Sequence, residues 1–185
     1  MLRNISLYVL PVIVALAGAG TALAQGTGTV SDADYIKQVG PGAPAAVVQS
    51  ATIVRMDKGG AMRTVQTGTN GFTCMMLDPT TPMCADKNAM AWAAALMGHK
   101  APPNSVGFIY MLAGDDGTSN TNPYDDKPTA SNHWVKTGPH VMIVGPAAAT
   151  MGYPSTADAD TTKPFVMWPN TPYAHLMIPV VTAPQ

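Results

Sequence analysis

Two copies of a His-x-Met pattern stand near the C-terminal end of the sequence, and their side chains are suited to metal chemistry. His140 and Met142 form the first copy, and His175 and Met177 form the second. Both copies lie in β-prone runs, where residues i and i+2 point to the same face of a strand. If the two strands pair, four ligands of a kind that Cu(I) accepts converge, which predicts a copper ion as cofactor. The alternative interpretation is ordinary burial, because Met fills irregular gaps in cores and His can simply begin a strand.

A second set of candidate ligands lies in the polar stretch between residues 114 and 136. Its carboxylates are Asp115, Asp116, Asp125 and Asp126. Oxygen-rich loops of this kind suit Ca²⁺. The match to an EF-hand loop is poor, since Gly117 and Asn120 stand where an acidic or amide residue and a glycine are required. A solvated loop whose Asp and Asn side chains cap their own turns is therefore the alternative.

The histidines also permit a hydrolase, with His140 or His175 as general base and a nearby Asp as its orienting partner. The sequence names no nucleophile for such an enzyme, because G-x-S-x-G, Walker A, S-x-x-K and C-x-x-C motifs are all absent. Five aromatic residues in the C-terminal half could stack on a sugar or a peptide if exposed, although burial is the default for such rings. They are Tyr124, Trp134, Tyr153, Trp168 and Tyr173.

The composition narrows the possible functions. The 185 residues include 10 basic and 11 acidic side chains, so there is no basic excess with which to bind nucleic acid. Every acidic residue is Asp, which excludes mechanisms that need a Glu base, such as H-E-x-x-H. With 46% hydrophobic residues the chain can bury a core, and its length is typical of one domain.

The N-terminus predicts export. Arg3, a short apolar stretch and Ala22-Leu23-Ala24 are typical of a signal peptide over residues 1–24, cleaved between Ala24 and Gln25. We expect no transmembrane span in the remaining chain and a periplasmic or secreted location. Cys74 and Cys84 are the only cysteines, and in an oxidising compartment a structural disulfide between them is favoured over a redox or metal site.

The elements that must position these side chains follow from local pattern. Residues 25–42 are predicted to be a flexible or short helical segment, and residues 43–185 a single α+β domain. Two β-prone runs around a Gly-Gly turn predict a hairpin at 51–65, followed by a third strand at 72–75. Helical spacing predicts one main α-helix over 86–97, with Asp86 as its cap and Gly98 as its stop. Further strands are expected at 106–112, 140–144, 164–168 and 175–181, in a mostly antiparallel sheet against which the helix packs, with prolines keeping the last two short or at sheet edges.

Several ordered motifs resemble a group of uncharacterised, exported bacterial proteins of similar length. The motifs are Asn70-Gly71-Phe72-Thr73-Cys74, Pro82-Met83-Cys84, Gly138-Pro139-His140-Val141-Met142 and Thr171-Pro172-Tyr173-Ala174-His175-Leu176-Met177. No activity is known to us for that group, so the resemblance implies no catalytic residues. Together these features predict a non-catalytic binding or envelope-associated protein, whose partner is a small molecule, a metal or an envelope component. A periplasmic copper-binding protein and a hydrolase are the two alternatives.

Overall fold

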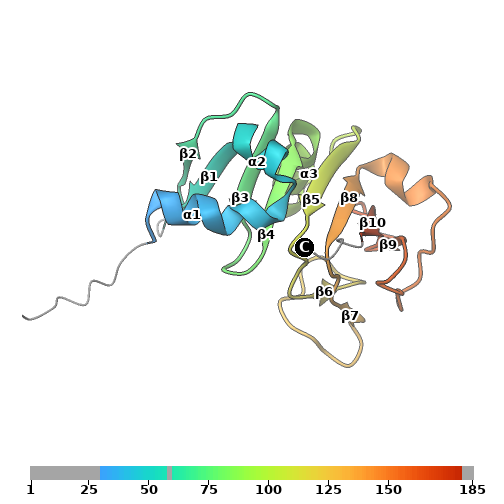
Figure 1. The fold of residues 1–185 in the computed structure, drawn as a ribbon. Coiled ribbons are helices and arrows are strands. Elements are labelled where there is room, and N and C mark those ends of the chain that lie inside the picture. Colours follow the sequence, from blue (N-terminus) through green and yellow to red (C-terminus); the bar gives the residue numbers. More distant parts are fainter. Residues whose placement is uncertain (1–29, 58–59, 181–185) are drawn as a thin grey trace, which may run out of the picture.

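The computed structural model describes residues 30–57 and 60–180, so the predicted signal peptide lies outside the described residues. One mixed sheet of eight strands forms the centre of the molecule, in the order β2-β1-β3-β4-β5-β8-β10-β9 (Figure 1). Its strands are β1 (Thr52–Met56), β2 (Met62–Gln66), β3 (Phe72–Met76), β4 (Pro82–Asp86), β5 (Gly107–Met111), β8 (His140–Val144), β9 (Phe165–Met167) and β10 (His175–Pro179). The predicted α+β class and the mostly antiparallel sheet are confirmed.

The N-terminal half of the sheet contains the predicted hairpin, in which β1 and β2 pair antiparallel. β3 then runs parallel to β1, which is the one parallel pairing of the described sheet. β4 pairs antiparallel with β3 and was not expected from the sequence, because its prolines and short polar flank resembled a turn. In the C-terminal half of the sheet the neighbouring strands are β5, β8, β10 and β9, in this order, and each pairs antiparallel with the next.

Helices cover both faces of the sheet, so the expectation of one main helix is too simple. α1 (Asp32–Val39), the 3-10 turn η1 (Gly40–Gly42) and α2 (Ala45–Ser50) lie on one face. α3 (Lys87–Met97) lies on the other face, capped as predicted by the Asp86 carboxylate, which accepts a hydrogen bond from Ala89 N. Because Tyr35 and Val39 of α1 are buried, the folded part of the chain begins before residue 43.

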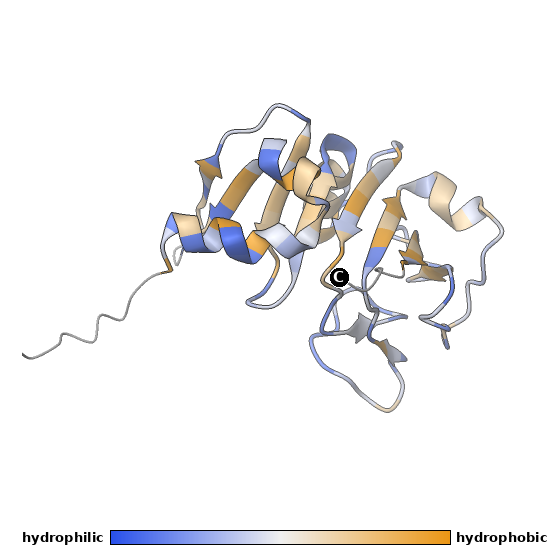
Figure 2. Cartoon of the chain, in the orientation of Figure 1, coloured by the Kyte–Doolittle hydropathy of each residue, from blue (hydrophilic) through white to orange (hydrophobic). Residues whose placement is uncertain are grey.

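Side chains point alternately to the two faces of the strands, which divides the core into two clusters. Hydrophobic residues (orange) lie along the central strands in Figure 2. On β4, Cys84 faces α1 and α2, while Met83 and Ala85 face α3. Cys84 forms the predicted disulfide with Cys74, its direct partner on β3. The larger cluster lies on the α3 face and continues beneath β8, β9 and β10.

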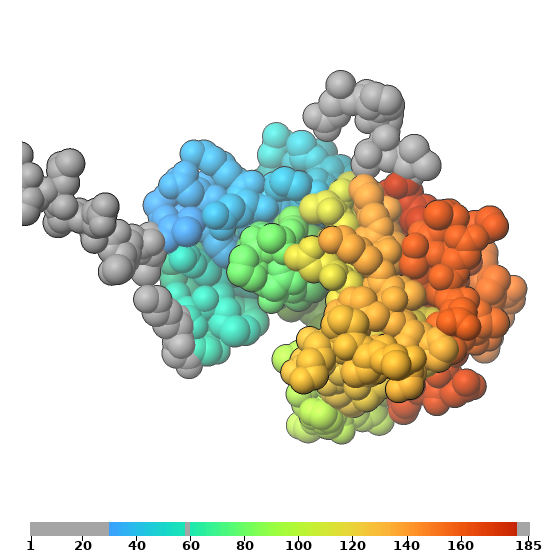
Figure 3. Space-filling model, turned by 90° about the horizontal axis from the view of Figure 1, so that it is seen from below, coloured from blue at the N-terminus to red at the C-terminus, as the bar shows by residue number. Residues whose placement is uncertain are grey.

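A long connection leaves β5 and returns to β8, and it carries a small second sheet of β6 (Thr118–Ser119) and β7 (Trp134–Val135). In Figure 3 this connection (gold) lies on the same side as the C-terminal strands (orange and red), away from the N-terminal helices (blue). β9 is short and lies at the edge of the sheet, as expected of a strand flanked by proline. β10 lies between β8 and β9 and ends at Pro179, so it is not an edge strand. Within residues 30–57 and 60–180, no helix is long and apolar enough to cross a membrane.

Candidate functional site

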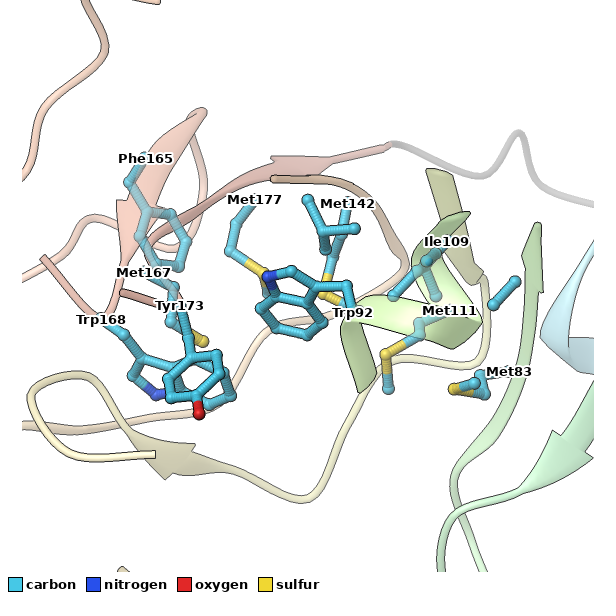
Figure 4. Packing of buried hydrophobic residues seen from close by; sticks show 13 residues of the cluster. Met83, Trp92, Ile109, Met111, Met142, Phe165, Met167, Trp168, Tyr173 and Met177 are labelled. Atoms are coloured by element: carbon cyan, nitrogen blue, oxygen red, sulfur yellow. The ribbon is translucent and has the colours of Figure 1, made fainter. Parts of the chain in front are cut away.

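Met142 and Met177 are direct partners on the neighbouring strands β8 and β10. Both side chains are buried on the α3 face and belong to the same cluster as Trp92, whose side chain Figure 4 draws with theirs. The same register places His140 opposite Pro179, at the far side of the methionine pair from His175. The structure therefore brings the two thioethers together and places one imidazole on each side of them.

His140 and His175 are held by the same kind of local hydrogen bond. In each, Nδ1 contacts the backbone carbonyl two residues earlier, at 2.7 Å from Gly138 O for His140 and 3.0 Å from Tyr173 O for His175. A carbonyl oxygen only accepts, so Nδ1 carries the proton and Nε2 keeps its lone pair. This arrangement fixes the tautomer and orientation that metal-binding histidines use.

Aromatic rings enclose His175. Its ring centroid lies 5.2 Å from that of Trp92 and 4.8 Å from that of Trp168, and both indoles meet the imidazole edge to face. Burial lowers the pKa of His175 to about 4; the hydrogen bond to Tyr173 opposes this change, and positive charge on His140 adds to it. The imidazole is therefore neutral at pH 7, which is the form that binds metals.

Trp168 is held in an unusual backbone conformation, with φ at +54°. Its indole Nε1 donates a 2.7 Å hydrogen bond to Ser119 O, which ties the end of β9 to the buried loop around β6. A bulky residue with positive φ costs free energy and persists only where its surroundings impose it, often beside functional sites. The two indoles around His175 thus come from α3 and from the end of β9, and the second indole is held by the loop around β6.

His140 faces a carboxylate instead of aromatic rings. Its Nε2 is fully buried, has no hydrogen-bond partner, and lies 4.0 Å from Asp115 Oδ2. The other oxygen, Oδ1, accepts hydrogen bonds from Gly117 N (2.9 Å) and Thr137 N (3.1 Å). The hydroxyl of Thr137 is also buried without a partner. Buried polar atoms without partners are rare in native proteins, so this cluster requires an explanation.

Burial dominates the electrostatics of this pair. It raises the pKa of Asp115, although the N–H groups of Thr137 and Gly117 and the charges of His140 and Lys136 lower it. It also lowers the pKa of His140, against the Gly138 hydrogen bond and the charge of Asp115. Each shift favours the neutral form of its group, because burial penalises charge on both side chains.

The geometry of Asp115 and His140 differs from that of a hydrolase dyad. In such a dyad the carboxylate accepts from Nδ1–H and leaves Nε2 free to take a proton from the nucleophile. In this structure Nδ1–H is bound to Gly138 O, and the carboxylate faces Nε2. No Ser, Thr or Cys side chain is hydrogen-bonded to either histidine within the described residues.

The four aspartates of the proposed calcium loop have separate surroundings. Asp115 is largely buried as described, whereas Asp116 is exposed and contacts Lys136 Nζ and the Thr80 hydroxyl. Asp125 accepts a hydrogen bond from Asn122, and Asp126 is exposed. Across residues 30–57 and 60–180, no group of three or more His, Cys, Asp or Glu side chains could hold a metal ion. The structure does not bring these aspartates to a common centre.

The hydrolase alternative expects an Asp near His140 or His175, but the sequence does not identify Asp115 as that residue, nor does it indicate that Trp92 lies against His175. The calcium-loop pattern contains Asp115 and the copper pattern contains His140, and neither pattern contains information about the other. The β5–β8 register brings the two residues together, because Met111 at the end of β5 pairs with His140 at the start of β8 and Asp115 follows Met111 closely in the chain. Among the five aromatic candidates, Trp168 and Tyr173 are buried, Trp134 is half-buried, and Tyr124 and Tyr153 are exposed.

No family model matches the sequence, and no significant match to a curated protein or to a solved structure was found. The geometry of the two histidine sites is therefore the basis for the functional conclusion.

Proposed function

We propose that the chain is an exported binding protein whose cargo is Cu(I), held by Met142, Met177 and His175. The observation that carries this proposal is the direct pairing of the two methionines on one buried face of the sheet. Thioether sulfur is a soft ligand that selects Cu(I), and imidazole is the borderline ligand that can complete the site. His175 is assigned to the pair because His140 faces Asp115.

The surroundings of His175 support this assignment. Its Nδ1 is engaged by Tyr173 O, which leaves Nε2 available, and its neutral state removes any proton that a metal would have to displace. Trp92 and Trp168 close the site with apolar surface, which limits the access of water. Restricted solvent access and low polarity tune the redox potential of a bound metal.

Export is part of the same proposal. The Cys74–Cys84 disulfide and the absence of a membrane-spanning helix among the described residues fit a secreted or periplasmic protein. The signal-peptide pattern of residues 1–24 and the resemblance to exported bacterial proteins point in the same direction. In that compartment the role is binding without catalysis.

Anaerobic titration of the purified chain with Cu(I), against a competing chelator, tests the cargo. Met142→Leu and Met177→Leu keep the side-chain volume and remove only the sulfur, at a cost below about 1.5 kcal/mol in stability. His175→Asn keeps a donor for Tyr173 O and removes Nε2. Each variant is expected to lower Cu(I) affinity by about tenfold or more, since even the partners of metal ligands contribute that much.

Met83→Leu is the matched control, because Met83 belongs to the same buried cluster but sits on β4, away from the pair. Its Cu(I) affinity should equal that of the wild type. Equal affinity in Met142→Leu, Met177→Leu and the wild type would show that these methionines are core residues only.

A further inference from the structure

His140, Asp115 and Thr137 present three electron-pair donors that have no partner. These are His140 Nε2, Asp115 Oδ2 and Thr137 Oγ1, and both Nε2 and Oγ1 are fully buried. The first two are 4.0 Å apart, too far for a hydrogen bond between them and near enough to share a third atom. The fully buried lone pair of His140 Nε2 lacks a partner, which costs free energy unless something positive lies beside it.

The chain holds these donors rigidly. Asp115 N donates to Thr137 O, and Thr137 N donates back to Asp115 Oδ1, so the two segments are linked in both directions. Gly114 makes the close approach possible, since it has φ at +79° and a Cβ there would lie 3.0 Å from Thr137 O. Gly138 O fixes the imidazole of His140 through Nδ1. This degree of order is expected of a binding site and is not needed for a solvated loop.

The geometry points to a second metal site, in which His140 Nε2 and Asp115 Oδ2 bind a divalent cation of borderline softness such as Zn²⁺. Imidazole and carboxylate are common zinc ligands, with bonds near 2.0–2.2 Å. Two ligands on a tetrahedral zinc stand about 3.4 Å apart. The observed 4.0 Å therefore needs a closure of roughly 0.6 Å.

Other cations fit the donors less well. Ca²⁺ takes six to eight oxygen ligands and Mg²⁺ demands octahedral oxygen, whereas this cluster includes a nitrogen and few oxygens. Cu(I) prefers the thioethers of the neighbouring site. The ammonium group of Lys136 contacts Asp116 Oδ1 at 3.1 Å.

This inference does not rest on the Cu(I) proposal, because it uses no sulfur ligand and a different histidine. The two fail separately: Met177→Leu should leave Zn²⁺ affinity unchanged, and Asp115→Asn should leave Cu(I) affinity unchanged. Loss of both metals in either variant would show that the sites are not distinct and would overturn the inference.

Calorimetric titration of the metal-free mature chain with Zn²⁺ alone is the test. Asp115→Asn retains an Oδ1 that can accept from Gly117 N and Thr137 N, and it should weaken Zn²⁺ binding by about tenfold or more. His133→Gln is the matched control, because His133 contacts Asp158 directly at 2.7 Å on the surface. Unchanged Zn²⁺ affinity is expected for this control.

A measurement on the wild-type protein tests the same site even if a variant fails to fold. Zn²⁺ should shift the NMR resonance of His140 Nε2 and leave that of His133 unchanged. The inference is overturned if the wild type binds no Zn²⁺, if Asp115→Asn binds it equally well, or if the His140 resonance does not move.

Discussion

At the scale of single residues, the two His-x-Met copies are alike in backbone and different in chemistry. Each histidine donates from Nδ1 to the carbonyl two residues before it. One imidazole then meets a carboxylate, and the other meets two indoles. A repeated motif therefore has two different chemical surroundings, because the elements that surround each copy come from elsewhere in the chain.

The disulfide gives a prediction at the same scale. Replacing Cys74 and Cys84 together by Ala should lower the free energy of unfolding by about 2–3 kcal/mol, since the loop that the bond closes is short. Urea unfolding of the oxidised wild type and the double variant measures this difference. Alkylation of the native wild type without reductant should label neither thiol, and labelling of both would contradict the bond.

At the scale of elements, α1 is attached to the hairpin by charge. Arg63 Nη1 on β2 donates to Asp32 Oδ2 at 2.8 Å, and Asp32 is the first residue of α1. The Arg63 hydrogen bond is the main cause that lowers the pKa of Asp32 below 3.8. A lowered carboxylate pKa contributes stability that is present above pH 3.8 and is lost as the pH falls through the folded-state pKa.

Asp32→Asn should therefore be less stable than the wild type at neutral pH. The difference between the two should shrink to nothing as the pH is lowered below 3.8, because protonation then removes the same charge from the wild type. Urea midpoints measured across the acid range test this prediction. A difference that persists at the lowest pH, or that is absent at neutrality, would contradict it.

The docking of α3 depends on a glycine. A Cβ at Gly107 on β5 would overlap the backbone nitrogen of Ala89 and lie 2.7 Å from its Cα. Gly107→Ala should thus push α3 from the sheet and cost about 1–3 kcal/mol. Gly138→Ala is the control, because a Cβ there has nothing within 4 Å. Thermal unfolding compares them, and equal stability of the two variants would refute the close approach.

Local sequence patterns predicted most helices and strands, but they did not predict which strands pair with one another. The cap at Asp86, the apolar run of β5 and the Gly-Gly hairpin are local features, and each stands where it was expected. β4 was missed because a strand with Pro at its start shows little alternation, and only the strands on both sides of it make it a strand. The approach of Asp115 to His140 depends on the β5–β8 register, which no local pattern contains.

At the scale of the whole molecule, one sheet separates two hydrophobic clusters that have different helices. The smaller cluster holds the disulfide, and the larger holds both methionines of the copper proposal. Export of this unit predicts a mature chain that begins at Gln25. Intact-mass measurement of protein recovered from the periplasm or the medium tests this, and a mass that retains residues 1–24 would contradict it.

The position of the disulfide has a further consequence for strand register. Cys74 and Cys84 are direct partners on adjacent antiparallel strands, so their bond prevents β3 and β4 from sliding past one another. A slip of one residue would turn Met83 and Ala85 from the α3 face to the α1 face and Cys84 to the α3 face, so β4 would place the wrong side chains in both clusters. The bond thus fixes the register of β3 and β4, and with it the face of β4 that each helix contacts. Reduced protein should populate more than one register of these two strands.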